Sequence, residues 1–216
     1  MILCANPKSQ YLANKSEIDV AVLNVLESGT YILGEQVSLF EQEFAEYLEI
    51  NYAIGCASGT DALVLALKAL DIGLGDEVIV PSHTAVPTVA AVVLSGAIPV
   101  FVDIELDYFT MAPQGVHEAC TDKTKAIIAV HLYGQSCAMD ELMQICRHRD
   151  LRMIEDCAQA AGASYRGKKL GTIGDIGCFS FFPTKNLSAI GDGGAIACRD
   201  KNLSDRLFGL RQYGWD

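Results

Sequence analysis

Short apolar runs alternate with stretches of helical periodicity along most of the 216-residue chain. Near its beginning, apolar residues recur at helical spacing, and we expect amphipathic helices around Ile18–Leu26, closing at Ser28-Gly29, and around Val37–Leu48. Beyond these helices, β-rich runs predict strands at Tyr52–Ala57, Glu77–Val80, Ile98–Val102, Ala126–Val130, Leu151–Ile154, Ile176–Phe181 and Ala195–Cys198. Helical stretches, including Thr60–Leu70 and Pro87–Ser95, separate these runs.

Strands that are apolar on both faces are typical of a mainly parallel sheet covered by helices on each side. The sequence therefore predicts an α/β fold with three layers (αβα). The composition agrees, because 50% hydrophobic and 20% charged residues are enough to bury one large core. We find no repeat and no linker, and we interpret Gly191-Asp192-Gly193-Gly194 as a turn before the last strand.

The charge and the longest apolar run exclude two classes of partner. The formal net charge of -11 comes without a basic stretch, so nucleic acid would be repelled and is not an expected partner. The run Val86–Val102 is interrupted by Pro87, Ser95-Gly96 and Pro99, and no positively charged leader precedes an apolar segment, which argues against a membrane partner. We therefore expect a soluble cytoplasmic protein.

The eight cysteines include no C-x-x-C pair, and several lie within apolar runs. We expect reduced thiols that pack as small core residues and no metal site, since zinc ligands usually come in close pairs. The histidines have no metal-like spacing either; they are His83, His117, His131 and His148. Of these, His131 is expected to pack or to orient a loop.

Asp156 and Lys185 form the most informative pair of candidate site residues. Asp156 follows the apolar run that ends at Ile154, and parallel α/β sheets bind ligands at this carboxyl edge. A buried carboxylate needs a cation, such as a protonated pyridine nitrogen, and a lysine near it can form a Schiff base with an aldehyde cofactor. Together they suggest pyridoxal phosphate chemistry. The alternatives are a solvated surface lysine and a carboxylate that caps a helix or joins a surface ion pair.

Ser58-Gly59-Thr60 forms a small-residue turn between a predicted strand and a predicted helix. Free N–H groups and the positive end of the helix dipole favour a phosphate there, although a simple N-cap by Ser58 or Thr60 explains the same residues. The turn is neither a G-x-G-x-x-G nor a P-loop motif, so it does not support a dinucleotide or a nucleoside triphosphate. Gln159, close after Asp156, and Ser180, close before Lys185, are further candidates.

Several segments then occur in a recognisable order: S-G-T-D-A-L, G-D-E-V-I-V-P-S-H-T, P-V-F-V-D-I, H-L-Y-G, I-E-D-C-A-Q-A, S-F-F-P-T-K-N and G-D-G-G-A-I. In this order they resemble the DegT/DnrJ/EryC1/StrS family of pyridoxal phosphate enzymes. Members of that family are mostly nucleotide-sugar aminotransferases with the aspartate aminotransferase-like fold. The resemblance extends from Ser28 to Trp215.

The resemblance implies an enzyme that uses pyridoxal 5'-phosphate to move an amino group, from glutamate, to a keto sugar carried on a nucleotide. It implies that Lys185 is the Schiff-base lysine and Asp156 the catalytic partner of the pyridine nitrogen. Gln159 would lie over the phenolic oxygen side, and Gly59, Thr60 and Ser180 would contact the phosphate. Lys185 argues against the dehydratase branch of the family, in which histidine replaces the lysine.

Two residues depart from the family pattern. Ala85 stands where many members have an aromatic ring that stacks on the cofactor, so either His83 or another residue stacks or the ring is held less tightly. Asp192 stands where a glutamate is common, which is a mild change.

Family members also continue into a small C-terminal domain, which the resemblance implies is absent from residues 1–216. The resemblance implies that residues 1–216 are the large, cofactor-binding domain, with an N-terminal helical segment over residues 1–50, and that the full-length protein is a homodimer. Two alternatives are a non-catalytic remnant that keeps the fold and a dinucleotide-dependent dehydrogenase, whose glycine fingerprint is missing here.

Overall fold

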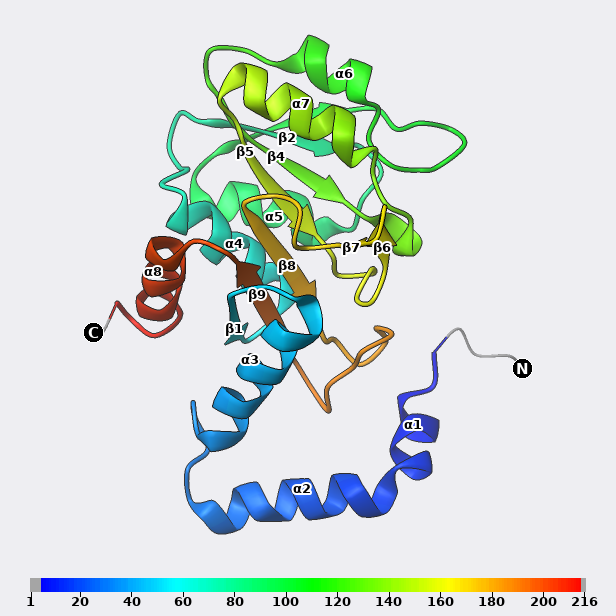
Figure 1. Cartoon of the computed structure of the whole chain (residues 1–216), viewed down its shortest axis with the longest axis vertical. Helices are drawn as coiled ribbons and strands as arrows, with labels where there is room; N and C mark the ends of the chain where they lie inside the picture. Colours follow the sequence, from blue (N-terminus) through cyan, green and yellow to red (C-terminus); the bar gives the residue numbers. More distant parts are fainter. Residues whose placement is uncertain (1–4, 215–216) are drawn as a thin grey trace.

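The computed structural model describes residues 5–214 and has a seven-stranded sheet at its centre (Figure 1). Its strands, in the order in which they lie side by side, are β1 (Tyr52–Cys56), β9 (Gly194–Cys198), β8 (Ile176–Ser180), β5 (Arg152–Asp156), β4 (Thr124–Val130), β2 (Glu77–Pro81) and β3 (Ile98–Val102). The strands from β8 to β3 are parallel, whereas β9 runs antiparallel to both of its neighbours. A short hairpin of β6 (Ser164–Tyr165) and β7 (Lys168–Lys169) forms a separate two-stranded sheet.

Helices cover both faces of the sheet. On one face lie α4 (Gly59–Ala69), α5 (Val86–Ser95) and α8 (Lys201–Arg211), and on the other lie α3 (Glu35–Leu48), α6 (Pro113–Ala119) and α7 (Met139–Arg149). Successive strand residues point to opposite faces, so Ile154 packs in the first core and Met153 in the second. The predicted three-layer α/β fold is therefore confirmed.

The predicted elements beyond residue 50 all occur, and their ends differ from the prediction by at most two residues. The strands were recognisable because they are apolar on both faces, as the fully buried β8 and β9 show. Four further helices, α1 (Pro7–Ala13), α6, α7 and α8, were not predicted from the sequence. In α7 the helical residues Met139, Leu142 and Cys146 are buried, but they are separated by charged and polar positions.

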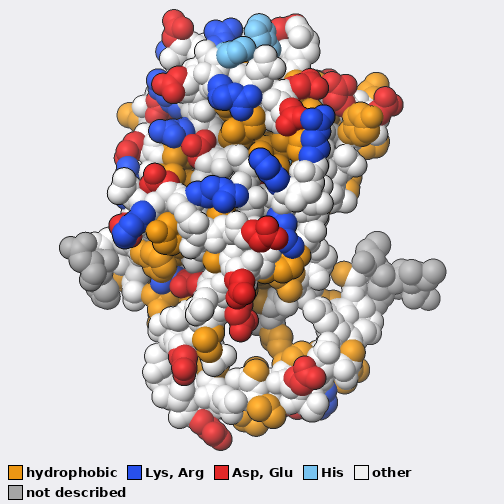
Figure 2. Space-filling model, viewed as in Figure 1, with side chains coloured by type: hydrophobic (Ala, Val, Ile, Leu, Met, Phe, Trp, Pro, Cys, Tyr) orange, Lys and Arg blue, Asp and Glu red, His pale blue; other side chains and the backbone are white. Residues whose placement is uncertain are grey.

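The first predicted helix forms but does not pack against the sheet. This helix, α2 (Lys15–Ser28), ends at Gly29, whose φ of 70° is a left-handed conformation that favours glycine. None of its residues is buried, and Val20, Leu23 and Leu26 are each more than half exposed. It extends away from the sheet in Figure 1, and Figure 2 shows a gap between it and the rest of the molecule. The apolar face that its spacing predicted is thus uncovered in the structure described.

The seven cysteines between residues 5 and 214 are free thiols, and most of them are buried. Burial raises the pKa of the Cys157 and Cys178 thiols well above the usual range, which keeps them protonated. The expectation of unpaired core thiols is confirmed for the five that are buried, whereas Cys56 and Cys120 are partly exposed. Cys4 lies outside the described residues. None of the helices between residues 5 and 214 is long and apolar enough to cross a membrane.

Candidate active site

The loops that follow the parallel strands meet at the carboxyl edge of the sheet, and all the predicted site residues lie there. Residues 157–159 follow β5, and residues 181–185 follow β8. The turn after β1 reaches the same edge, since Cys56 at the end of β1 pairs with Gly194 and Gly194 pairs with Ser180. Strand order therefore brings together residues that are far apart in the sequence.

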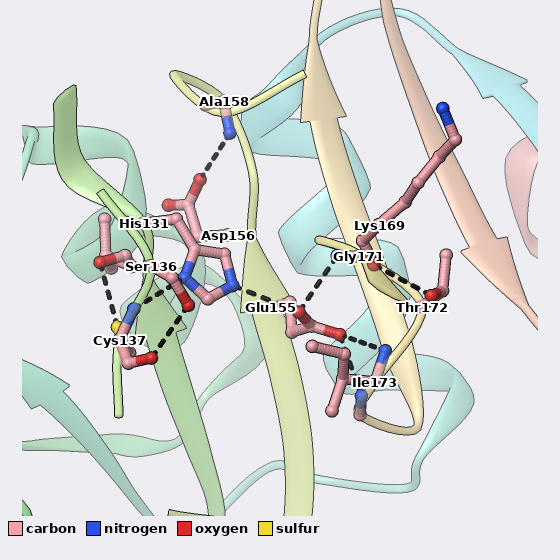
Figure 3. A network of polar contacts seen from close by, with 12 residues as sticks. His131, Ser136, Cys137, Glu155, Asp156, Ala158, Lys169, Gly171, Thr172 and Ile173 are labelled. Atoms are coloured by element: carbon pink, nitrogen blue, oxygen red, sulfur yellow. Dashed lines mark hydrogen bonds and ion pairs between the residues drawn. The ribbon is translucent and has the colours of Figure 1, made fainter. Parts of the chain in front are cut away.

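Asp156 ends β5 and is only 5% exposed (Figure 3). Its Oδ1 accepts a hydrogen bond from the backbone N–H of Ala158 at 3.1 Å, and its Oδ2 accepts one from the hydroxyl of Thr88 at 2.8 Å. Burial raises the pKa of Asp156, while these two hydrogen bonds and the positive charge of Lys185 act in the opposite direction. The carboxyl group is thus held in a fixed orientation and placed where a cation would favour its ionised form.

Lys185 lies in the loop between β8 and β9 and is half-buried. Its backbone N–H donates to Phe182 O at 2.8 Å, and the side-chain amide of the next residue, Asn186, donates to Ala161 O at 2.6 Å. The first bond forms a turn within the loop, and the second ties the loop to the segment that follows β5. Lys185 and Asp156 therefore both lie at the carboxyl edge, and the charge of Lys185 acts to lower the pKa of the buried Asp156.

Ser180 and Gly59 pack directly against each other. A Cβ atom on Gly59 would lie 2.6 Å from the Cβ atom of Ser180, so only glycine allows this approach. Ser58 is the N-cap of α4, as its hydroxyl accepts from the N–H of Asp61 at 3.1 Å, and the N–H groups of Gly59 and Thr60 begin the helix. Such N–H groups have no partner within the helix. The cap and the phosphate interpretations are therefore compatible, with Ser180 adding a hydroxyl.

Gln159 lies at the same edge, and the oxygen of its side-chain amide already accepts a hydrogen bond. Its Oε1 accepts from the backbone N–H of Tyr133 at 2.8 Å, which leaves its NH2 group as a donor. Tyr133 has the left-handed φ of 58°, rare for a residue with a large side chain, and its hydroxyl lies 3.2 Å from Nε2 of His83. Ala85 is exposed and has no ring, whereas the imidazole of His83 lies near the rings of Tyr133 and Phe109, at centroid distances of 6.1 and 6.2 Å.

His131 orients two loops, as predicted, through a partner that the sequence analysis missed. Its Nε2 lies 3.1 Å from Oε2 of the buried Glu155, and its Nδ1 accepts from the backbone N–H of Cys137 at 3.2 Å (Figure 3). Glu155 also accepts from three N–H groups of the segment after β7, at 2.7 to 2.9 Å, those of Gly171, Ile173 and Gly174. Burial raises the pKa of Glu155, but these hydrogen bonds outweigh it and the net shift is downward.

His131, Glu155 and Cys157 place their ligand atoms within 4.8 Å of one another, which is close enough for a metal ion. The hydrogen bonds argue against one. The Nδ1 lone pair of His131 accepts from Cys137, so Nε2 carries the proton and donates to Glu155, and burial keeps the Cys157 thiol protonated. We interpret this group as a structural network. A glutamate inside an apolar run was the only sequence signal for it.

Comparison with known proteins decides the family. The model of the DegT/DnrJ/EryC1/StrS aminotransferase family matches residues 13–216. The chain belongs to this family. It is 47% identical to the UDP-N-acetyl-3-dehydro-alpha-D-glucosamine 3-aminotransferase of Acidithiobacillus ferrooxidans over 207 residues, which cover 96% of this chain and 56% of that protein.

Solved structures agree with this assignment. The crystal structure of DesV from Streptomyces venezuelae, in complex with a ketimine intermediate, matches with a TM-score of 0.97 at 46% identity and covers 99% of this chain and 58% of that one. NtdA from Bacillus subtilis, solved with bound cofactor PMP, matches with a TM-score of 0.85 at 36% identity and covers 90% of this chain and 44% of that one. The chain thus spans about half the length of these relatives.

Proposed function

We propose that the protein is a pyridoxal phosphate-dependent aminotransferase that moves an amino group from glutamate to a keto sugar carried on a nucleotide. The observation that carries this proposal is the buried, hydrogen-bonded Asp156 at the carboxyl edge, with Lys185 in a loop at the same edge, in a chain of an aminotransferase family. A dinucleotide-dependent dehydrogenase is disfavoured, because the turn after β1 has no G-x-G-x-x-G fingerprint and leads directly into α4.

The residues at the edge fit the cofactor group by group. Asp156 offers a carboxylate that is held by two donors and can face a protonated ring nitrogen. The NH2 group of Gln159 is a donor suited to a phenolic oxygen, since its Oε1 is already occupied. Ser180, Gly59 and Thr60 combine a hydroxyl with helix N-terminal N–H groups, which suit a phosphate. Lys185 supplies the amine that holds the cofactor covalently.

When bound, pyridoxal phosphate supplies a ring that withdraws electrons from the carbon that carries the amino group. Lys185 would hold the cofactor through its Nζ and, once freed by a donor amine, would accept and return the proton that moves during amino transfer. Asp156, when ionised, would hold the proton on the ring nitrogen. Each half of the cycle uses these same two residues, first with glutamate and then with the keto sugar.

The substrate class follows from the family and from the names of relatives. The Acidithiobacillus relative acts, by its name, on a UDP-linked sugar with a ketone at carbon 3. We therefore choose nucleotide sugars with a 3-ketone as the first substrates to test. Lys185 is the residue that favours amino transfer over the dehydratase branch, in which histidine stands at this position.

We further propose that the sheet and its flanking helices form the cofactor-binding domain, that residues up to about 50 form an N-terminal helical segment, and that the protein works as a homodimer. Uncovered apolar surface supports association with a second subunit. A cavity of about 990 Å³ is lined by apolar side chains from α3, α4 and α8, among them Phe40, Val64 and Leu210. It adjoins Gly194 but neither Asp156 nor Lys185, so we assign it to association and not to chemistry.

The test is a titration with pyridoxal phosphate, followed by borohydride reduction and peptide mass analysis. The expected result is a visible absorbance band that reduction removes, with added mass on Lys185. Lys123, an exposed lysine just before the N-terminal end of β4 and thus away from the carboxyl edge, should gain no mass. Turnover with glutamate and a 3-keto nucleotide sugar then separates an enzyme from a non-catalytic remnant. A chain that forms no adduct at Lys185 would contradict the proposal.

A further inference from the structure

Two threonines of the segment after β2 form a chain of hydrogen bonds that ends on Asp156. The Oγ1 of Thr84 lies 2.8 Å from the Oγ1 of Thr88, and the Oγ1 of Thr88 lies 2.8 Å from the Oδ2 of Asp156. Thr88 is 1% exposed and lies in the first turn of α5, whose N-cap is Ala85. No role in the resemblance or in the family comparison falls on either threonine.

The direction of this chain follows from the number of protons. A hydroxyl has a single proton, so when Thr88 donates to an ionised Asp156 it must accept from Thr84. The order is then Thr84 to Thr88 to Asp156. If Asp156 were protonated and donated to Thr88, both hydroxyls would have to turn, and Thr88 would donate to Thr84. The chain is therefore sensitive to the charge on the carboxyl group.

An ionised Asp156 needs this support because it is buried. Burial raises the pKa of the carboxyl group, and four groups act to lower it: the N–H of Ala158, the hydroxyl of Thr88 and the neighbouring side chains of Lys185 and His131. Nδ1 of His131 accepts from Cys137 and its Nε2 faces Glu155, so this imidazole makes no hydrogen bond to Asp156. Lys185 is the residue proposed to hold the cofactor, and its charge changes during the reaction. Thr88 and Ala158 are thus the constant donors to the carboxylate.

We propose that Thr88, supported by Thr84, is a positioning residue that keeps Asp156 ionised and oriented toward the ring nitrogen of the cofactor. Thr88 acts only through Asp156. The inference rests on the proposed function as far as the cofactor is concerned, whereas its effect on the ionisation of Asp156 is a property of the chain alone.

The decisive measurement uses the 216-residue protein without cofactor, with carbon-13-labelled aspartate to follow the titration of the Asp156 carboxyl group by NMR. Thr88→Val keeps the shape of the side chain and removes the hydroxyl, and it should raise the pKa of Asp156; Thr88→Ser should restore the parent value. Thr84→Val should shift the pKa in the same direction by less. An unchanged pKa in Thr88→Val, or in Thr84→Val if the first variant does not fold, would overturn the proposal.

The second measurement adds pyridoxal phosphate labelled with nitrogen-15 in the ring. Thr88→Val should move the ring nitrogen resonance toward the unprotonated position and weaken cofactor binding by roughly 10- to 100-fold, the range expected for one hydrogen bond to a charged group. Thr124→Val is the matched control, because it removes a buried hydroxyl (4% exposed) at the N-terminal end of β4, away from the carboxyl edge. It should leave the resonance unchanged. A protonated ring in Thr88→Val would overturn the proposal, whereas failure of the parent to bind cofactor would contradict only the proposed function.

Discussion

Glu155 and Asp156 are consecutive residues of β5, both buried, and their carboxyl groups point to opposite faces of the sheet. Glu155 meets His131 and the N–H groups after β7, whereas Asp156 meets Thr88 of α5. Hydrogen bonds lower the pKa of Glu155, and burial raises that of Asp156. The carboxylate of Glu155 is therefore part of the scaffold. The carboxyl group of Asp156 lies at the edge, where burial disfavours its ionised form and a cationic ligand would stabilise it.

Replacing Lys185 by alanine should abolish covalent cofactor attachment and reduce amino transfer by roughly 100-fold or more, since it removes both the attachment and the acid–base group. Steady-state kinetics and the absorbance titration measure the two effects. Lys123→Ala is the control and should behave like the parent. Turnover near the parent rate in Lys185→Ala would show that another residue carries the chemistry.

Asp156→Asn should lower the rate of the half-reaction with glutamate by roughly 100- to 1,000-fold, because a neutral amide does not hold a proton on the ring nitrogen. The same change should stabilise the cofactor-free protein by about 1 kcal/mol, within the usual gain from removing a strained site group. Its raised pKa means that Asp156 opposes folding increasingly as pH rises above its usual value of 3.8. The stability gain should therefore be present at neutral pH and absent well below pH 3.8, which thermal denaturation across pH can show.

Glu155→Gln should destabilise the fold by about 3–5 kcal/mol, the range for breaking a buried charged network. The amide NH2 would face N–H donors that now meet a carboxylate oxygen. Because the pKa of Glu155 is lowered on folding, its contribution is present above the usual value of 4.5 and is lost as pH falls through the folded-state pKa. Urea denaturation at neutral and acid pH should show a difference between variant and parent that narrows in acid.

Gly59→Ala should weaken phosphate binding and destabilise the protein by about 1–3 kcal/mol, because its Cβ would lie 2.6 Å from that of Ser180. Adding Ser180→Gly should recover much of the stability, because it removes the Cβ atom that the new methyl group would meet. It should not restore phosphate binding, because it also removes the Ser180 hydroxyl. Gly115→Ala in α6 is a suitable control, as its Cβ would be 3.7 Å from the nearest atom. Equal melting temperatures for Gly59→Ala and Gly115→Ala would show that the close approach has no energetic consequence.

The sequence by itself determined the layers of the fold and indicated where the proposed chemistry would lie. Runs that are apolar on both faces can only be buried inside a sheet covered on each side, so the strands were predicted to within two residues. Asp156 follows one such strand, and the carboxyl edge of a parallel sheet is where ligands bind. Local periodicity and strand position were sufficient for both conclusions.

Only the tertiary structure decided which side chains meet. Thr88 and Asp156 are 68 positions apart and touch because the order β5-β4-β2 brings the start of α5 over the end of β5. The contact of Gly59 with Ser180 depends in the same way on β9 lying between β1 and β8. The apolar stripe of α2 predicted a covered face, yet that face is uncovered over the residues described. Periodicity reports which side of an element avoids water, but strand order and register, which are non-local, decide what that side touches.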